Sequence, residues 1–183
     1  PALAQEGSEL PVAMPTKVPA KPLTASPAPA RPAGTVVTPA WVKDAIFYQI
    51  FPERFANGDR KNDPKGTEPW GAIPKVDNYM GGDLDGVRQS LPYLQALGVT
   101  PVYVIPIFTS DSNHKYHTVD YMHVDPAFGG DAAFDRLLAA AHGRGMKVIL
   151  DGVFNHTGDT HPFFLDAAKK GSKSKYWKWY RFD

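Results

Sequence analysis

Polar side chains that could bind or activate a substrate follow three runs of β-forming residues. Glu53 and Arg54 follow the first run, a polar loop follows Ile107 at the end of the second, and the third leads into Asp151–His156. In parallel β/α folds the carboxyl ends of the strands carry the functional side chains. We therefore expect carboxylate and imidazole groups to meet there, although a helix cap or a solvated loop would explain any one position alone.

Two further groups of residues could hold a metal ion. Four short oxygen-bearing side chains lie within seven residues, at Asn57, Asp59, Asn62 and Asp63. They suit a hard cation such as Ca²⁺, which takes roughly six to eight oxygen ligands, and an Asx-rich surface turn is the alternative. A zinc cluster of three histidines is disfavoured because the run lacks thiolates and an acidic ligand at standard spacing; these are His114, His117 and His123.

The elements that position these residues alternate between β and helical patterns. Three apolar runs predict buried parallel strands, at residues 45–51, 102–107 and 147–153. Between them, apolar residues recur at helical spacing and predict two helices, over residues 84–94 and from about Asp131. Pro92 within the first of these weakens the helical pattern because an interior proline removes a hydrogen bond.

This alternation predicts an α/β fold made of three β/α units. A closed eight-stranded (β/α)8 barrel needs about 250 residues, so the 183 residues would supply only the first three units of an incomplete barrel. An open doubly wound sheet fits the same alternation. No glycine-rich phosphate turn follows any of the strands, which disfavours dinucleotide binding.

Composition separates the first forty residues from the rest. Nine of the 18 prolines fall within residues 1–40, which predict a disordered Pro/Ala-rich linker before a globular part at residues 41–183. Ala2-Leu3-Ala4 has the spacing of a signal-peptide cleavage site, which favours an extracellular or cell-envelope location without excluding the cytoplasm. The 20 basic and 19 acidic side chains indicate no nucleic-acid partner. No apolar run reaches the roughly 20 residues of a membrane span.

Four motifs, in order, resemble those of the α-amylase superfamily (glycoside hydrolase family 13), and most closely its neopullulanase and cyclomaltodextrinase subgroup. The motifs are residues 46–55 (IFYQIFPERF), 80–84 (MGGDL), 113–116 (NHKY) and 151–156 (DGVFNH). The resemblance runs from about Trp41 to Asp183. It implies the N-terminal part of a catalytic (β/α)8 barrel, with residues 157–183 beginning the subdomain after the third strand.

The resemblance also implies roles for individual residues. Tyr116 would stack on the sugar ring at the cleavage subsite, with His114 supporting its loop; Asp151 and His156 would hydrogen-bond hydroxyls of the same sugar. Asn155 would brace the loop after the third strand. A calcium site would comprise Asn57, Asp59, Asn62, Asp63, Gly81 and Asp83. His117 departs from the pattern, as does Met122-His123 after an otherwise familiar Asp120-Tyr121 pair, which leaves the fine specificity open.

We therefore expect a fragment of a retaining glycoside hydrolase that acts on α-1,4-glucans such as starch, maltodextrin, cyclodextrin or pullulan. Its paired carboxylates would lie on later strands, so no catalytic residue is assigned to this chain. A transglycosylase, a sugar isomerase and a noncatalytic carbohydrate-binding relative are the alternatives. The aromatic stretch at residues 176–182 could line a sugar groove, but we favour the core of the subdomain.

Overall fold

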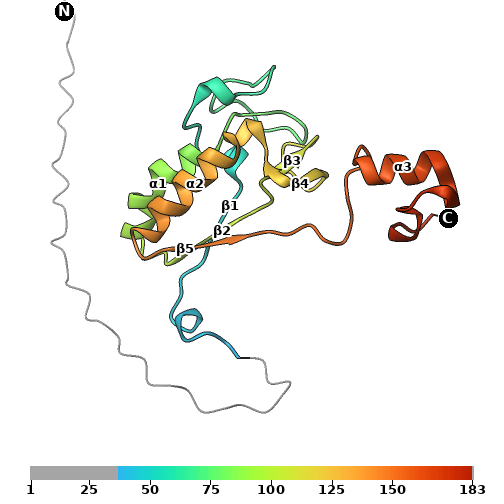
Figure 1. Ribbon diagram of the computed structural model, residues 1–183. Coiled ribbons are helices and arrows are strands. Elements are labelled where there is room, and N and C mark those ends of the chain that lie inside the picture. The colour runs from blue at the N-terminus through green and yellow to red at the C-terminus, as the bar shows by residue number, and fades with distance from the viewer. Residues whose placement is uncertain (1–36, 183) are drawn as a thin grey trace, which may run out of the picture. The chain divides into compact units, whose positions relative to one another are not determined.

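Three short parallel strands form the main sheet of the computed structural model, which describes residues 37–182. The strands β1 (Tyr48–Ile50), β2 (Pro101–Val104) and β5 (Lys147–Leu150) lie in the order β1-β2-β5 (Figure 1). Val102 pairs with Tyr48 on one side and with Val148 on the other. The three predicted strands are therefore present and parallel. The linker prediction for residues 1–40 falls almost entirely outside the described residues.

Each strand is shorter than its apolar run. Only the three residues of β1 within the run at 45–51 pair with another strand. Ile46 and Phe47, which precede β1, are about half exposed, at 55% and 48%. After β2, one more ladder bond forms from Ile105 N to Ile50 O at 3.1 Å. Pro106 then has no N–H to continue the ladder, so the chain leaves the sheet there.

Two helices cover the sheet and pack against each other. Helix α1 (Leu84–Ala96) buries Leu84, Val87, Leu91 and Leu94 as predicted, and α2 (Gly130–His142) buries Ala133, Leu137 and Ala141. Figure 1 shows α1 and α2 side by side. Their buried side chains join those of the strands in one apolar core, whose burial supplies the main driving force for this packing.

Pro92 does not interrupt α1. It lies on the exposed face of the helix. Because proline has no N–H, the carbonyl group of Arg88 loses its helical partner, but it can bind water there instead. The start of the helix is fixed by Asp83, whose Oδ1 accepts a hydrogen bond of 2.7 Å from Gly86 N. A Cβ atom at Gly86 would collide with the Ala56 carbonyl oxygen, so the loop after β1 approaches α1 closely only because this residue is glycine.

An antiparallel hairpin that the periodicity did not predict follows β2. It consists of β3 (Phe108–Ser110) and β4 (Thr118–Val124), and its register is irregular on both sides of Thr109. Three-residue β3 is too short to give an alternating pattern, which explains why it was missed. The hairpin holds residues 111–117 as a loop beyond the end of β2.

The C-terminal part of the described chain is a helix packed by aromatic side chains. After α3 (Pro162–Lys170), the Trp177 and Phe182 rings stack with centroids 4.2 Å apart, and Phe163 stacks on Tyr176 at the same distance. Trp179 is 67% exposed. Most of this aromatic stretch therefore packs on itself and on α3, and none of the side chains at residues 176–182 is fully buried.

Six single-turn 3-10 helices complete the described elements, at Ala40–Val42, Pro52–Arg54, Arg60–Asn62, Pro126–Phe128, Gly171–Lys173 and Trp177–Trp179. Among the helices within residues 37–182, none combines the length and the apolar character that a membrane crossing requires.

Candidate functional site

The centre of the candidate site is a contact between the β3–β4 loop and the end of β5. The Tyr116 hydroxyl donates a hydrogen bond of 2.6 Å to Asp151 Oδ2. Asp151 is held in place because its backbone N–H donates to Val104 O at 3.0 Å, one step beyond the β2–β5 ladder. Burial and the Asp151 carboxylate raise the pKa of Tyr116 to about 12. Tyr116 is therefore a neutral donor at all ordinary pH values.

His114 orients the backbone of Tyr116. Its Nδ1 accepts a hydrogen bond of 3.1 Å from Tyr116 N and lies 3.3 Å from Ser112 Oγ. Nδ1 must therefore be unprotonated. Burial, together with the nearby His117 and Lys115, lowers the pKa of His114, which favours this neutral form.

His156 closes the site from the loop after β5. Its Nε2 lies 3.1 Å from the Tyr116 carbonyl oxygen, to which it can donate. Asn155 Nδ2 lies 3.5 Å from His156 Nδ1 and both side chains are exposed. The four residues predicted to form one sugar subsite are thus joined by direct contacts, although they come from two loops.

This arrangement suits a hydroxyl-rich ring. The Tyr116 ring offers an apolar face, the Asp151 carboxylate accepts hydrogen bonds from hydroxyls, and an imidazole can donate or accept. Tyr103 on β2 is a neighbour that the sequence did not suggest. Burial and the Asp151 carboxylate raise the pKa of Tyr103, so it too stays a neutral donor.

Glu53 and Arg54 brace the fold instead of joining this site. The Glu53 side chain is buried; its Oε1 accepts hydrogen bonds from Met80 N and Gly81 N, and its Oε2 lies 2.8 Å from Arg54 Nη1. Burial is the main cause that raises the pKa of Glu53. Arg54 Nη2 donates at 2.9 Å to the carbonyl groups of Lys75 and Asn78. The expectation that this pair carries function at the strand end is therefore corrected to a structural role.

The residues predicted to bind calcium lie together around the start of α1. Asp83 Oδ2 accepts hydrogen bonds from Asp59 N at 2.9 Å and Asn62 Nδ2 at 3.0 Å, and Asn57 Nδ2 donates to Asp63 Oδ1 at 2.7 Å. Asn57 Oδ1 and Asn62 Oδ1 are buried without any hydrogen-bond partner. Two orphaned amide oxygens in one loop fit a hard cation that takes oxygen ligands.

Two observations limit the donors that such a cation could use. Asp83 Oδ1 already accepts hydrogen bonds from Gly58 N and Gly86 N, so this carboxylate is occupied as a helix cap. Within residues 37–182, no three His, Cys, Asp or Glu side chains are gathered as metal ligands. The fit therefore depends on amide and carbonyl oxygens, including that of Gly81, with Asp63 and Asp59 as the nearby charges.

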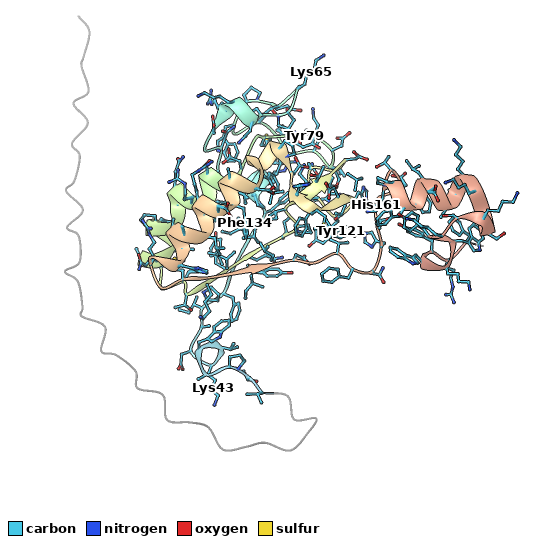
Figure 2. The ribbon with its side chains drawn as sticks, in the orientation of Figure 1. Lys43, Lys65, Tyr79, Tyr121, Phe134 and His161 are labelled. Carbon is cyan, nitrogen blue, oxygen red and sulfur yellow. The ribbon has the colours of Figure 1, made fainter. Side chains whose placement is uncertain are left out.

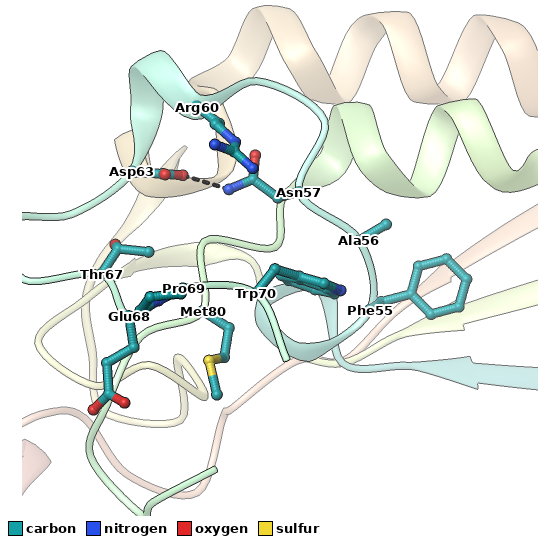
Figure 3. A pocket seen from close by; sticks show the side chains of 10 residues that line it. All are labelled: Phe55, Ala56, Asn57, Arg60, Asp63, Thr67, Glu68, Pro69, Trp70 and Met80. Atoms are coloured by element: carbon teal, nitrogen blue, oxygen red, sulfur yellow. Dashed lines mark hydrogen bonds between the residues drawn. The ribbon is translucent and has the colours of Figure 1, made fainter. Parts of the chain in front are cut away.

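A pocket of about 710 Å³ opens beside this loop. Figure 3 shows Asn57, Arg60 and Asp63 along one side of it and Trp70 and Met80 along another.

A second pocket, of about 360 Å³, adjoins the Tyr116 site through His156 and Asn155. It also includes Tyr121 and His161, whose rings lie 6.0 Å apart (Figure 2).

The three histidines weighed as a zinc cluster are separated. The His114 and His117 rings are 5.0 Å apart, but His123 Nδ1 lies 3.1 Å from Asp131 Oδ2 at the start of α2. His114 Nδ1 is already used by Tyr116 N. These contacts give each of the three side chains a different environment.

Comparison with known proteins identifies the fold to which this site belongs. The family model described as "Alpha amylase, catalytic domain" matches residues 49–183. The chain belongs to the α-amylase family. Among curated relatives, Neopullulanase 2 of Thermoactinomyces vulgaris is 56% identical over 145 residues, which are 78% of this chain and 25% of that protein. Cyclomaltodextrinase of a Bacillus species is 56% identical over 143 residues, with 78% and 26% covered.

Solved structures of the α-amylase family agree with the fold. The ligand-free cyclic alpha-maltosyl-(1-->6)-maltose hydrolase from Arthrobacter globiformis matches with a TM-score of 0.76 and 44% identity, over 79% of this chain and 33% of that one. The chain therefore spans about a quarter of the length of these curated relatives and a third of this structure. Family membership and the β/α architecture are confirmed on this basis.

One residue that braces the site in this α-amylase family member was not predicted. The Tyr121 hydroxyl on β4 lies 2.6 Å from Val153 O and 2.8 Å from His156 O, so it holds the loop that carries His156. Asn155, predicted to brace this loop, has one side-chain hydrogen bond within the described residues, of 3.5 Å to its neighbour His156. The Asp120-Tyr121 pair resembles the family pattern, and this was the available signal for Tyr121.

Proposed function

We propose that this chain is the N-terminal part of the catalytic (β/α)8 barrel of a retaining glycoside hydrolase that acts on α-1,4-glucans. The main observation that supports this proposal is the Tyr116–Asp151 hydrogen bond of 2.6 Å. His114 and His156 also bind the backbone of Tyr116. The names of two relatives, neopullulanase and cyclomaltodextrinase, support substrates of the maltodextrin, pullulan and cyclodextrin class.

In this proposal the residues of the chain bind and orient one glucose unit. The Tyr116 ring stacks on the sugar face, while the Asp151 carboxylate accepts hydrogen bonds from sugar hydroxyls. Contacts of this kind can strengthen as the ring distorts toward the oxocarbenium-like transition state. His156 donates from the rim of the site, and His114 keeps the Tyr116 loop in place.

Bond cleavage needs residues beyond these four. The retaining route uses two carboxylates about 5 to 5.5 Å apart, one as nucleophile and one as acid/base. The family resemblance assigns them to the fourth and fifth barrel strands, so residues 1–183 alone would not hydrolyse the glycosidic bond. Asp151 is a binding residue in this scheme.

We also propose that Ca²⁺ binds the loop after β1. Asn57 Oδ1 and Asn62 Oδ1 would supply neutral oxygens, Asp59 and Asp63 the compensating charge, and Gly81 a backbone carbonyl. Asp83 would hold Asn62 and the backbone of Asp59 in place. The ion would stabilise the connection between this loop and the start of α1 and take no part in the chemistry.

Product analysis of the complete protein tests the proposed function. The protein is incubated with β-cyclodextrin, maltoheptaose and pullulan, and the products are separated by size while the anomer of the new reducing end is followed by NMR. We expect shorter maltooligosaccharides released as the α-anomer. Products longer than the substrate would favour the transglycosylase, and the absence of any turnover would contradict both.

A further inference from the structure

We propose that Lys115 is a positioning residue that holds Tyr116 and His114 in the geometry needed to bind the reacting sugar. This inference rests on the proposed function for its kinetic consequence. Its structural content, that the Lys115 side chain fixes the loop, can be tested separately.

The Lys115 side chain is buried and paired. It is 2% exposed, and its Nζ lies 2.8 Å from Asp125 Oδ2. The same Nζ lies 5.1 Å from the centroid of the Phe128 ring and 5.6 Å from that of Tyr79. The ammonium group is therefore enclosed by one carboxylate and two aromatic faces, where attraction is little screened by water.

Lys115 has a strained backbone conformation, and in this conformation its side chain pairs with Asp125. Its φ is +62°, and it is the only residue other than glycine with a positive φ within residues 37–182. A left-handed conformation is disfavoured for a side chain of this size unless the surroundings impose it. Here it directs Lys115 into the core while its two neighbours, His114 and Tyr116, contact each other at the site.

Asp125 connects this anchor to the whole hairpin. Besides Lys115, its carboxylate accepts hydrogen bonds from Ser110 N at 3.0 Å and Ala127 N at 2.9 Å. Ser110 Oγ in turn donates to His117 O at 2.8 Å. Both ends of the 111–117 loop are thus tied to the carboxylate that binds Lys115.

Stability alone is a weak explanation for a buried charge pair. Removing two charges from water costs much of what their attraction returns, and apolar side chains of similar size often stabilise a core as well. A charge pair is directional, however, and can select one backbone conformation among several. The location between two site residues, together with the strained φ, favours this second role.

A double-mutant cycle in the complete protein tests the inference. Lys115→Met keeps an unbranched side chain, one atom shorter, and removes the charge. Lys147→Met is the control, since Lys147 is exposed and its Nζ lies over the Trp41 ring, 5.2 Å from the centroid. We expect Lys115→Met to lower kcat/KM on maltoheptaose by about 10- to 100-fold, mainly through kcat, because small displacements of orienting groups have effects of this size. Lys115→Arg should recover most of the loss.

The decisive comparison uses Tyr116→Ala. If Lys115 acts through Tyr116, Lys115→Met should lower kcat/KM by less than about threefold in the Tyr116→Ala background. The side chain that Lys115 orients is then already absent. An equal loss in both backgrounds would overturn the inference, as would a Lys115→Met protein with unchanged kinetics.

Amide hydrogen exchange supplies a readout that does not need turnover. Lys115→Met should accelerate exchange across residues 111–118 and leave β5 unchanged; uniform acceleration would indicate a purely structural role and overturn the proposal. If Lys115→Met fails to fold, Lys115→Met/Asp125→Asn removes the unpaired buried carboxylate and is measured in its place. An inactive wild type with the predicted exchange pattern would contradict the proposed function and leave the loop assignment standing.

Discussion

Tyr116 and Asp151 are 35 positions apart in the chain and share a hydrogen bond of 2.6 Å between the phenol hydroxyl and the carboxylate. One residue lies in the hairpin loop after β2 and the other at the end of β5. Because β2 and β5 are adjacent and parallel, their carboxyl ends bring these two segments together. The site is thus a direct consequence of the strand order.

Removing the Tyr116 hydroxyl and removing its ring should have different effects. Tyr116→Phe loses a hydrogen bond to a charged group, so kcat/KM of the complete enzyme on maltoheptaose should fall by roughly 10-fold. Tyr116→Ala also loses the stacking surface and should fall by about 100-fold or more. Tyr93→Phe, at a 60% exposed position on α1, is the control and should match the wild type. Equal losses in the two Tyr116 variants would argue against stacking.

Alkaline titration should detect the Tyr116 hydroxyl. Its folded-state pKa of about 12 lies above the ordinary value of 10.0, so the folded state holds this proton more tightly than the unfolded state does. The associated stability is complete below pH 10 and is lost as the pH rises toward 12. The wild-type minus Tyr116→Phe absorbance at 295 nm should therefore show tyrosinate forming near pH 12. A transition near pH 10 would indicate that the hydroxyl is neither buried nor bound by Asp151.

His114 should make the protein sensitive to acid. Its pKa is lowered from 6.5, so its contribution to stability is present above pH 6.5 and is lost as the pH falls toward the folded-state pKa. His114→Asn keeps an acceptor near Tyr116 N but cannot take up a proton. The fall in Tm between pH 7.5 and pH 5 should be smaller in this variant than in the wild type. An identical fall in both proteins would show that His114 is not held neutral.

Calcium should stabilise the loop after β1. Adding Ca²⁺ to the chelator-treated complete protein should raise Tm, because an ion that binds only the folded state stabilises it by mass action. Asp59→Ala should abolish this increment, whereas Asp159→Ala, a change at another exposed aspartate, should preserve it. The same calcium-dependent rise in Asp59→Ala would rule out the assigned ligand set.

The sequence predicted the parts of the fold that follow a simple period. The Leu84–Leu94 stripe and the three apolar runs led to α1 and the parallel sheet, because burial on one helix face or in a sheet interior leaves a regular pattern. The hairpin that carries Tyr116 leaves no such pattern. Its loop is fixed by the buried Lys115–Asp125 pair, which in sequence reads as two ordinary charged residues ten positions apart.

The candidate site residues were predicted from ordered motifs, and the residues that support them were not. His114, Tyr116, Asp151 and His156 are close together, as expected for one sugar subsite. Asp125 acts through hydrogen bonds from backbone N–H groups that form only in the folded chain, so no spacing rule could indicate it. For Tyr121, whose hydroxyl bonds to backbone carbonyl groups, the family-like Asp120-Tyr121 pair was the one signal. Glu53 is the opposite case. We expected a functional carboxylate after the first strand, whereas the Glu53 side chain is buried and supports the fold.

The rate at which the complete protein releases reducing ends from maltoheptaose, measured beside Asp151→Asn, tests the central claim most directly. Asp151→Asn preserves shape and removes the charge that would accept hydrogen bonds from the sugar. We predict clear turnover by the wild type and a loss of kcat/KM of about 100-fold in the variant, with Tm nearly unchanged. Equal rates for the two proteins would show that the Tyr116–Asp151 site does not bind the reacting sugar.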